Sequence, residues 1–305
     1  MRFPRYAWSV VAANLFVILW GALVRATGSG AGCGRHWPLC NGVMLPEAPA
    51  TPTVIEFTHR ATSGLALVLV VGLFWWSRSA FPAGHRARQA AGWSLVFIFL
   101  EALIGAGLVL FGLVGDNDSL GRAAYLAAHL LNTFLLLGAL ALTAHWSAAA
   151  PASSAPARGA TRWILGVGLA AILIVGMTGA IAALGDTLFP AQTVAEGFRA
   201  DRDPAAHFLV RLRVLHPVLA ILAGIYLSAM VWAVGRRHPM VMEGPWGRTV
   251  TWLVLLQLGI GLANLFLLAP TAIQLVHLLV ADLLWMGTVV FAAEGAMAQG
   301  RNGAK

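Results

Sequence analysis

The chain has 305 residues, of which 59% are hydrophobic and only 10% are charged, and its formal net charge is +8. About a quarter of the residues in soluble domains are charged, so this composition excludes an ordinary water-soluble domain and a disordered chain. The 20 basic residues are scattered between long apolar runs, and this pattern predicts no nucleic-acid partner.

Eight apolar stretches are long enough to cross a membrane as helices, which takes about 20 residues each. In chain order they are residues 6–24, 53–77, 90–114, 123–144, 163–184, 208–235, 249–269 and 271–293. The alternating pattern of an outer-membrane barrel is absent. We therefore predict an all-α integral membrane protein in contact with lipid, whose first stretch is retained as a span and is not a signal peptide.

The distribution of charge predicts the orientation of these spans. Basic residues are more frequent in the segments that share a side with the N-terminus, which is typical of cytoplasmic loops. The opposite loops carry seven acidic residues: Glu47, Asp116, Asp118, Asp186, Glu196, Asp201 and Asp203. We expect a multi-pass protein of the cell membrane with both termini in the cytoplasm.

The chain divides into two similar halves, residues 1–147 and 163–305, joined by a cytoplasmic linker at 148–162 that is rich in Ala, Pro and Ser. Leu100-Glu101 with Ile104-Gly105 in span three matches Leu256-Gln257 with Ile260-Gly261 in span seven, and residues 24–28 of span one align with 175–179 of span five. Four spans per half predict two tandem four-helix bundles related by a pseudo-twofold axis along the membrane normal.

Four of the nine histidines lie at similar depth, about two turns inside the outer ends of the even-numbered spans: His59, His129, His216 and His277. A lone intramembrane histidine is usually a packing residue, but two per half at equal depth indicate ligand pairs. Imidazoles on paired helices can hold haem iron from both faces, whereas a zinc site would lack its third and fourth ligands. Pro217, directly after His216, is expected to bend span six beside the ligand.

Three acidic residues lie within the spans. Glu56 precedes His59 by one turn on the same helical face. A chemical role at that site and a structural pairing with Arg60 or Arg25 are both open for it. Glu101 and Asp282 lie deeper, and for each we favour a buried structural hydrogen bond over a chemical role.

The two cysteines, Cys33 and Cys40, lie in the first outer loop, residues 28–52. On the oxidising side of the membrane a disulfide persists, so a structural disulfide is the simplest interpretation. A redox-active thiol pair is the alternative.

Several motifs in the N-terminal half point to one family. Gly21-Ala22-Leu23-Val24-Arg25-Ala26-Thr27-Gly28-Ser29-Gly30, then Cys33, Trp37-Pro38 and Cys40-Asn41-Gly42, and finally Glu56-Phe57-Thr58-His59-Arg60 resemble the haem A synthase family. The resemblance extends over the whole chain in length, spans, halves and histidines. The C-terminal half supports it mainly through His216-Pro217 and His277, and its outer loop, about 185–206, lacks a cysteine pair.

The resemblance implies an oxidoreductase that oxidises the C8 methyl of haem O in steps to a formyl group, which gives haem A for terminal oxidases. It implies a resident haem b on His216 and His277 as cofactor and the substrate, haem O, on His59 and His129, with Glu56 as catalytic residue. The residues themselves support this division, because only the N-terminal site has Glu56 and the cysteine loop beside it. The haem propionates would then face the outer surface, near Arg25, Arg60, Arg122, Arg211 and Arg213.

The resemblance also implies haem O synthase and cytochrome oxidase assembly as partners. Two other classes of protein remain open: a dihaem b-type electron-transfer protein, which does not need Glu56, and a haem transporter or chaperone. The sequence leaves open the electron donor or acceptor, the source of the formyl oxygen and the oligomeric state, a homo-oligomer included.

Overall fold

The structure is a computed structural model that describes residues 2–47, 49–148, 159–238 and 244–298. These residues form helices and loops without a strand, apart from one isolated bridge between Cys40 and Val43. Eight of the helical segments are long and apolar enough to cross a membrane. The predicted all-α, multi-pass membrane architecture is therefore confirmed.

The spans coincide with the predicted stretches. They are α1 (Phe3–Ala26), α2 (Thr51–Ala80), α3 (Arg86–Leu110), α4 (Leu120–Ala148), α5 (Ala160–Leu188), α7 with α8 (Phe208–Arg213 and Leu215–Arg237), α10 (Pro245–Phe266) and α11 (Thr271–Ala298). The predictions 90–114 and 249–269 extended too far. Helix α3 ends at Leu110, before Gly112 with a φ of 65°, and α10 ends at Phe266, before Leu268 and Ala269 with φ of 61° and 52°. Such a left-handed backbone ends a helix. Most helices also continue beyond the predicted stretches into more polar flanks, where hydropathy gives no signal.

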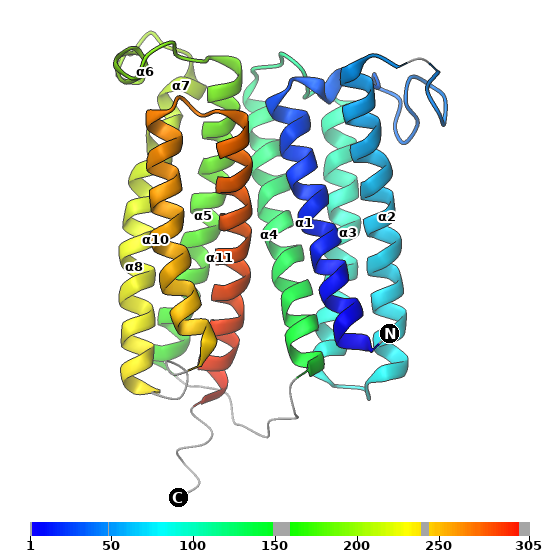
Figure 1. Ribbon diagram of the computed structural model, residues 1–305, viewed down its shortest axis with the longest axis vertical. Coiled ribbons are helices and arrows are strands. Elements are labelled where there is room, and N and C mark those ends of the chain that lie inside the picture. The colour runs from blue at the N-terminus through cyan, green and yellow to red at the C-terminus, as the bar shows by residue number, and fades with distance from the viewer. Residues whose placement is uncertain (1, 48, 149–158, 239–243, 299–305) are drawn as a thin grey trace, which may run out of the picture.

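Two groups of helices stand side by side (Figure 1). In the first, α1 packs on α2 and α4, and α3 packs on α2 and α4; in the second, α5 packs on α8 and α11, and α10 packs on α8 and α11. Helices α4 and α5, α4 and α11, and α1 and α11 meet between the groups. The pseudo-twofold axis and the boundaries at 147 and 163 stay predictions, and residues 149–158 of the predicted linker lie outside the described part.

The centre of the molecule is the contact between α4 and α11, the two spans with the largest buried share. The indole N–H of Trp285 donates a hydrogen bond to the carbonyl of Phe134, and the two rings stack with centroids 5.6 Å apart. Among apolar helices in lipid, such close packing and interhelical hydrogen bonds stabilise association. This contact fixes the two bundles beside each other.

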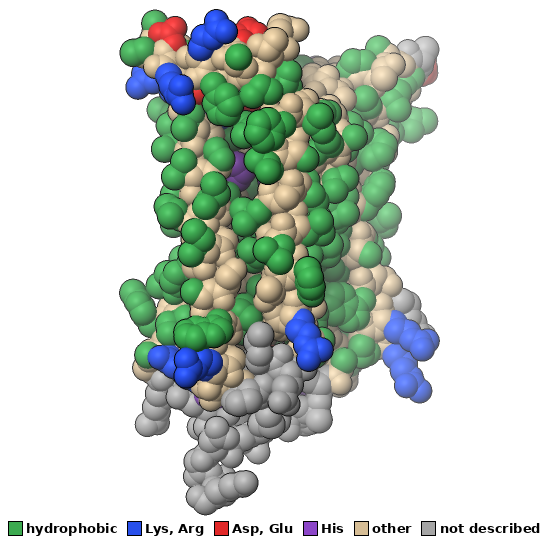
Figure 2. Space-filling view, turned by 60° about the vertical axis from the view of Figure 1, so that its left-hand side comes forward, with side chains coloured by type: hydrophobic (Ala, Val, Ile, Leu, Met, Phe, Trp, Pro, Cys, Tyr) green, Lys and Arg blue, Asp and Glu red, His purple; other side chains and the backbone are tan. Residues whose placement is uncertain are grey.

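Both described ends of the chain lie at the same end of the bundle (Figure 1). The opposite end, called the loop end below, consists of residues 27–47, 49–50, 111–119, 189–207 and 267–270 and includes the short helices η1 (Ser29–Ala31) and α6 (Val194–Ala200). On the face shown in Figure 2, acidic and basic side chains lie together at the loop end, while the described residues of the other end show basic ones. The acidic residues thus lie on the side to which the sequence assigned them.

Span six is broken beside His216. Helix α7 ends at Arg213 and α8 begins at Leu215, with Val214 between them. Pro217 has no N–H to donate to the carbonyl of Arg213, so a continuous helix would lack that bond. The helix is thus interrupted at Val214, as the missing donor at Pro217 predicts, although Val214 keeps helical backbone angles of φ −62° and ψ −29°. The bend beside His216 stays a prediction.

Candidate functional site

The four intramembrane histidines lie at matching depth, as predicted. His59 is on α2, His129 on α4, His216 on α8 and His277 on α11. Each follows the first residue of its span at the loop end by six to nine positions. At 1.5 Å per residue this corresponds to depths of about 9–14 Å. Their common level is a consequence of helix geometry and could be predicted from the sequence.

All four histidines line one cavity of about 1540 Å³ that extends across both bundles. Glu56 and Glu101 line the same cavity on the N-terminal side, and Gln257 lines it on the C-terminal side. The two histidine pairs are therefore parts of one connected site. A cavity of this size, mainly apolar and with a few polar groups, is typical of a site for a large cofactor or substrate.

Each histidine faces a glycine on a neighbouring helix. A Cβ added to Gly21 would lie 2.8 Å from Cε1 of His59, and one added to Gly179 would lie 3.0 Å from Cε1 of His216. A side chain at either position would displace the ring. In the same way, Gly105 on α3 faces His129, and Gly261 on α10 faces His277.

These contacts correct the internal alignment of the two halves. The counterpart of Gly179 is Gly21, about two helical turns before Gly28, so the alignment of residues 24–28 with 175–179 is wrong. A shift of about two turns brings nearly the same face of a helix back into register. The apolar pattern of the two spans therefore matches almost equally well in either alignment. The match of Gly105 with Gly261 is confirmed.

The C-terminal pair has the spacing of two ligands on one metal ion. The ring centroids of His216 and His277 are 6.2 Å apart, and the ring planes are perpendicular. Two imidazoles that bind a metal from opposite sides, with bonds of about 2.0–2.1 Å, place their ring centres about 6 Å apart. Nδ1 of His216 lies 3.2 Å from the carbonyl of Val175, a contact that leaves Nε2 for a metal. The donor set and its spacing therefore fit a haem iron.

The N-terminal pair has a carboxylate beside one ring. Nδ1 of His129 lies 3.2 Å from Oε1 of Glu101. Asn132 donates to Oε2 of Glu101 at 2.5 Å, and the hydroxyl of Thr133 donates to Oε1. The predicted structural hydrogen bonds of Glu101 are thus present, but its proximity to His129 was not predicted. The sequence held a signal for this proximity: Glu101 and Gln257 match, and each precedes by one turn a glycine, Gly105 or Gly261, that faces a histidine.

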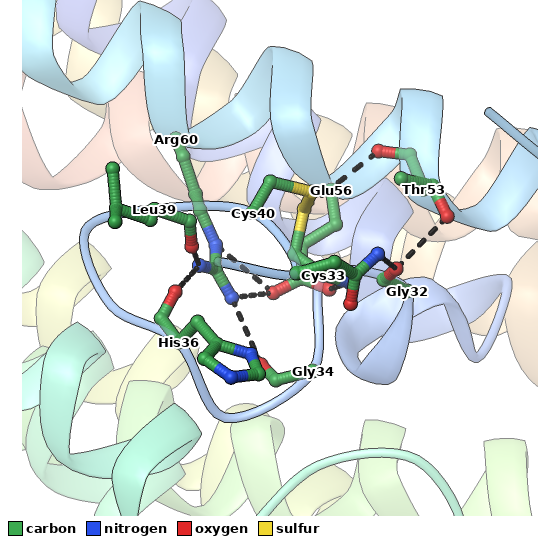
Figure 3. Close-up of polar contacts among 10 residues, drawn as sticks. Gly32, Cys33, Gly34, His36, Leu39, Cys40, Thr53, Glu56 and Arg60 are labelled. Atoms are coloured by element: carbon green, nitrogen blue, oxygen red, sulfur yellow. Dashed lines mark hydrogen bonds and ion pairs between the residues drawn. A yellow bond between two sulfur atoms is a disulfide. The ribbon is translucent and has the colours of Figure 1, made fainter. Parts of the chain in front are cut away.

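Glu56 is the centre of a polar cluster under the first loop (Figure 3). Its side chain is almost completely buried, with 4% exposed. Oε2 accepts a hydrogen bond from the backbone N–H of Cys33 at 2.7 Å, and Oε1 accepts one from Nε of Arg60 at 3.1 Å. Of the two arginines considered as partners of Glu56, Arg25 and Arg60, the structure pairs Arg60 with it. Glu56 nevertheless also borders the cavity, one turn from His59.

Arg60 connects this cluster to the loop that carries the cysteines. Its guanidinium donates to the carbonyls of His36 at 2.6 Å and Leu39 at 2.5 Å (Figure 3). Cys33 and Cys40 form a disulfide, and both are buried. The predicted disulfide is confirmed, and with Glu56 and Arg60 it fixes the loop over the N-terminal part of the cavity.

Arg25 joins the two bundles. From α1 it donates to the carbonyl of Ala183 and the hydroxyl of Thr187, both at 2.6 Å, and to the side-chain oxygen of Gln274 at 2.8 Å. The two acceptors on α5 and the one on α11 all belong to the C-terminal half. This role could not be predicted from the sequence, because a residue near a helix end can face any neighbouring helix.

The other arginines considered for propionates also line the cavity, but most bind the protein itself. Arg122 donates to the carbonyl of Asn117 at 2.7 Å, and Arg213 binds Asp186 at 3.3 Å and also Asp201. Arg211 makes only a long contact with the carbonyl of Pro204, 3.5 Å, among the described residues.

Asp282 differs from Glu101. Its side chain is fully buried, and neither carboxylate oxygen has a hydrogen-bond partner in the described part of the chain. The structural hydrogen bond predicted for Asp282 is therefore not found there. Asp282 is also absent from the residues that line the cavity, although Leu278 and Ala281 on the same helix line it.

Comparison with known proteins identifies relatives of this chain. A family model described as cytochrome oxidase assembly protein matches residues 4–289. A protein of Thermus thermophilus, protoheme IX farnesyltransferase, is 47% identical over 299 residues, which are 98% of this chain and 49% of that protein. The chain thus spans about half the length of this relative.

Shorter matches connect the chain with heme A synthases. The heme A synthase of Geobacillus kaustophilus is 44% identical over 107 residues, 35% of this chain and 34% of that protein. The heme A synthase of Bacillus licheniformis is 47% identical over 100 residues, 33% of each chain.

Proposed function

The chain belongs to the family of cytochrome oxidase assembly proteins, and from this premise we propose that it is a haem A synthase. Its reaction would be the oxidation of the C8 methyl of haem O to a formyl group. This four-electron oxidation removes two hydrogens and adds one oxygen, so it requires an electron acceptor and an oxygen source besides haem O. The product, haem A, serves terminal oxidases. The partial identity with two heme A synthases supports this proposal.

The observation that carries the proposal is the unequal surroundings of the two histidine pairs on one cavity. Glu56 and Glu101 border the cavity on the side of His59 and His129. On the side of His216 and His277 the position equivalent to Glu101 is the neutral Gln257. The carboxylates beside the N-terminal histidines are suited to acid–base chemistry on a substrate, whereas the two acids that line the cavity from the C-terminal half, Asp186 and Asp201, are paired with Arg213.

We assign His216 and His277 to a resident haem b, whose bis-imidazole ligation fits their spacing of 6.2 Å. When bound, haem b supplies one-electron redox chemistry beside the substrate. Gly179 and Gly261 leave room for the two rings. His216 is oriented by the carbonyl of Val175, which favours a proton on Nδ1 and leaves the lone pair of Nε2 for iron.

We assign His59 and His129 to the iron of the substrate, haem O. Glu56 would act on the carbon being oxidised. Arg60 and the N–H of Cys33 hold its carboxylate in place. A fixed anion there stabilises positive charge that develops at the methyl carbon. It can also pass on a proton when a gem-diol loses water to give the formyl group.

The orientation follows from the distribution of charge. The loop end would face the outside of the cell membrane and both termini the cytoplasm. The substrate propionates would then lie near the loop end, where Arg211 makes the fewest hydrogen bonds of the five arginines considered, within the part of the chain that the structure describes. Haem O synthase, as the source of substrate, and terminal-oxidase assembly, as the destination of product, are the proposed partners.

One experiment tests this function against its rivals. The full chain is expressed in a host that makes haem O but no haem A, and the haems are extracted and identified. Haem A or a hydroxylated intermediate supports the enzyme. Haem B alone, with haem O unchanged, contradicts it and favours a dihaem electron carrier or a haem transporter.

The name of the Thermus relative suggests a second function, the transfer of a farnesyl group to protohaem IX. That name belongs to a protein of which this chain covers 49%. Expression in a host that lacks haem O separates the two activities. Accumulation of haem O there indicates farnesyl transfer, and its absence leaves methyl oxidation as the proposed reaction.

A further inference from the structure

The two histidine pairs differ in the group behind one ligand. In the N-terminal half, Oε1 of Glu101 lies 3.2 Å from Nδ1 of His129. In the C-terminal half, the equivalent Gln257 places its Nε2 3.2 Å from Nε2 of His277. A carboxylate thus meets the ring nitrogen that faces away from a haem, whereas an amide meets the nitrogen that would bind iron.

The carboxylate belongs to a set of polar residues that occurs in one half only. Asn132 and Thr133, three and four positions after His129, both donate to Glu101. The residues at the same spacing after His277 are Val280 and Ala281. The two donors occupy one oxygen each, so Glu101 is held as an acceptor with its negative charge next to the histidine.

We propose that Glu101 is a positioning residue that accepts a hydrogen bond from Nδ1–H of His129 and makes this imidazole a stronger electron donor to iron than His277. The inference rests on the proposed function, in which His129 binds the iron of the substrate haem. A carboxylate behind a ligating histidine fixes its tautomer and ring orientation and raises its basicity. The remaining nitrogen, Nε2, then points its lone pair into the cavity.

The geometry requires one small adjustment. Nδ1 of His129 is at hydrogen-bond distance from Oε1 of Glu101, but the ring is turned so that the angle at Nδ1 does not meet the criteria of a hydrogen bond. A turn of the ring about its side-chain bonds aligns the two atoms. Gly105 faces Cε1 of His129 with 3.9 Å to an added Cβ, more room than the other three rings have, so this turn is sterically open.

The consequence is a difference in reduction potential between the two irons. A more basic ligand stabilises the ferric over the ferrous state and so lowers the reduction potential. The iron beside Glu101 therefore holds electrons less strongly than the iron beside Gln257. With haem in both sites, this difference would favour electron transfer from the N-terminal site to the C-terminal one, the direction that oxidation of a substrate at His59 and His129 requires.

The test measures reduction potentials and does not depend on turnover. The full chain is purified in detergent, supplied with haem B to fill both sites, and titrated spectroelectrochemically. A His129→Ala variant identifies which of the two transitions belongs to the N-terminal site. We expect that transition to have the lower potential of the two in the unmodified protein.

Glu101→Gln is compared with Gln257→Ala as a control, because only Glu101 lies beside the Nδ1 of its histidine. Glu101→Gln should raise the N-terminal potential, increasing the ferrous-to-ferric ratio at a fixed potential at least tenfold, or about 59 mV for one electron, without changing the C-terminal potential. Gln257→Ala, which removes the amide beside His277, should leave the N-terminal potential unchanged.

Unchanged potentials in a folded Glu101→Gln protein overturn the inference while leaving the haem sites in place. If Glu101→Gln does not fold, the unmodified protein and His129→Ala decide, because an N-terminal potential that is not the lower of the two overturns the inference. If His129→Ala removes neither transition, the assignment of the site itself is wrong, and the proposed function fails together with the inference.

Discussion

Replacing Glu56 by Gln is the sharpest test of the N-terminal site, because it keeps the shape of the side chain and removes its charge. The structure gives this charge one ionic partner, Arg60, and one backbone donor, the N–H of Cys33. An amide oxygen still accepts from that N–H. The charge-assisted bonds to Arg60 are what the substitution removes.

The effect on stability follows from these contacts. Removing one partner of a buried ion pair costs about 3–5 kcal/mol. Arg60 retains carbonyl acceptors at His36 and Leu39 in the variant, so we expect a smaller loss, about 1.5–3 kcal/mol. The protein should still fold and bind haem b, because His216 and His277 belong to the other bundle.

The loss of activity should be larger than loosening of the loop that carries Cys33 and Cys40 would cause by itself. We expect haem A formed per mole of bound haem b to fall at least about tenfold, equivalent to roughly 1.4 kcal/mol of transition-state stabilisation. The matched control is Arg60→Gln, which breaks the same ion pair but leaves the carboxylate at the cavity. If Glu56 acts chemically, Glu56→Gln is the more damaging of the two. Equal activities of the two variants, or undiminished turnover in Glu56→Gln, would refute a chemical role and leave Glu56 as the anchor of the loop.

Three further predictions concern other parts of the molecule. Exchange of His216 or His277 for Ala should remove the absorption of the resident haem b, and a normal haem spectrum in both variants would contradict their assignment. Arg25→Met should lower the midpoint of thermal unfolding by at least about 5 °C, because charge-assisted bonds to both α5 and α11 are lost. The midpoint of Arg25→Lys should lie between those of Arg25→Met and the unmodified protein. An unchanged midpoint for Arg25→Met would show that Arg25 does not hold the bundles together. Cys33 and Cys40 should resist thiol labelling without reductant, and Cys40→Ser should destabilise the protein by about 2–3 kcal/mol; ready labelling of both thiols in the folded protein would argue against the disulfide.

The sequence was sufficient to predict features that depend on one helix at a time. Hydropathy marked the eight spans, because crossing the hydrocarbon core requires about 20 apolar residues whatever lies next to them. The fixed rise of the helix placed His59, His129, His216 and His277 at one level. The effect of Pro217 on span six was also predictable, because the missing N–H is a property of that residue alone.

Only the tertiary structure decided which of these helices and side chains meet. Arg60 binds Glu56 while Arg25 crosses to the C-terminal half, and Glu101 lies beside His129. The pairing of Gly21 with Gly179, in place of Gly28, also became clear only from the contacts with the histidine rings. The physical reason is that a span is apolar on nearly every side: the side toward lipid and the side toward another helix look alike. The direction of each side chain is therefore set by the packing of the eight helices and cannot be read from their hydropathy.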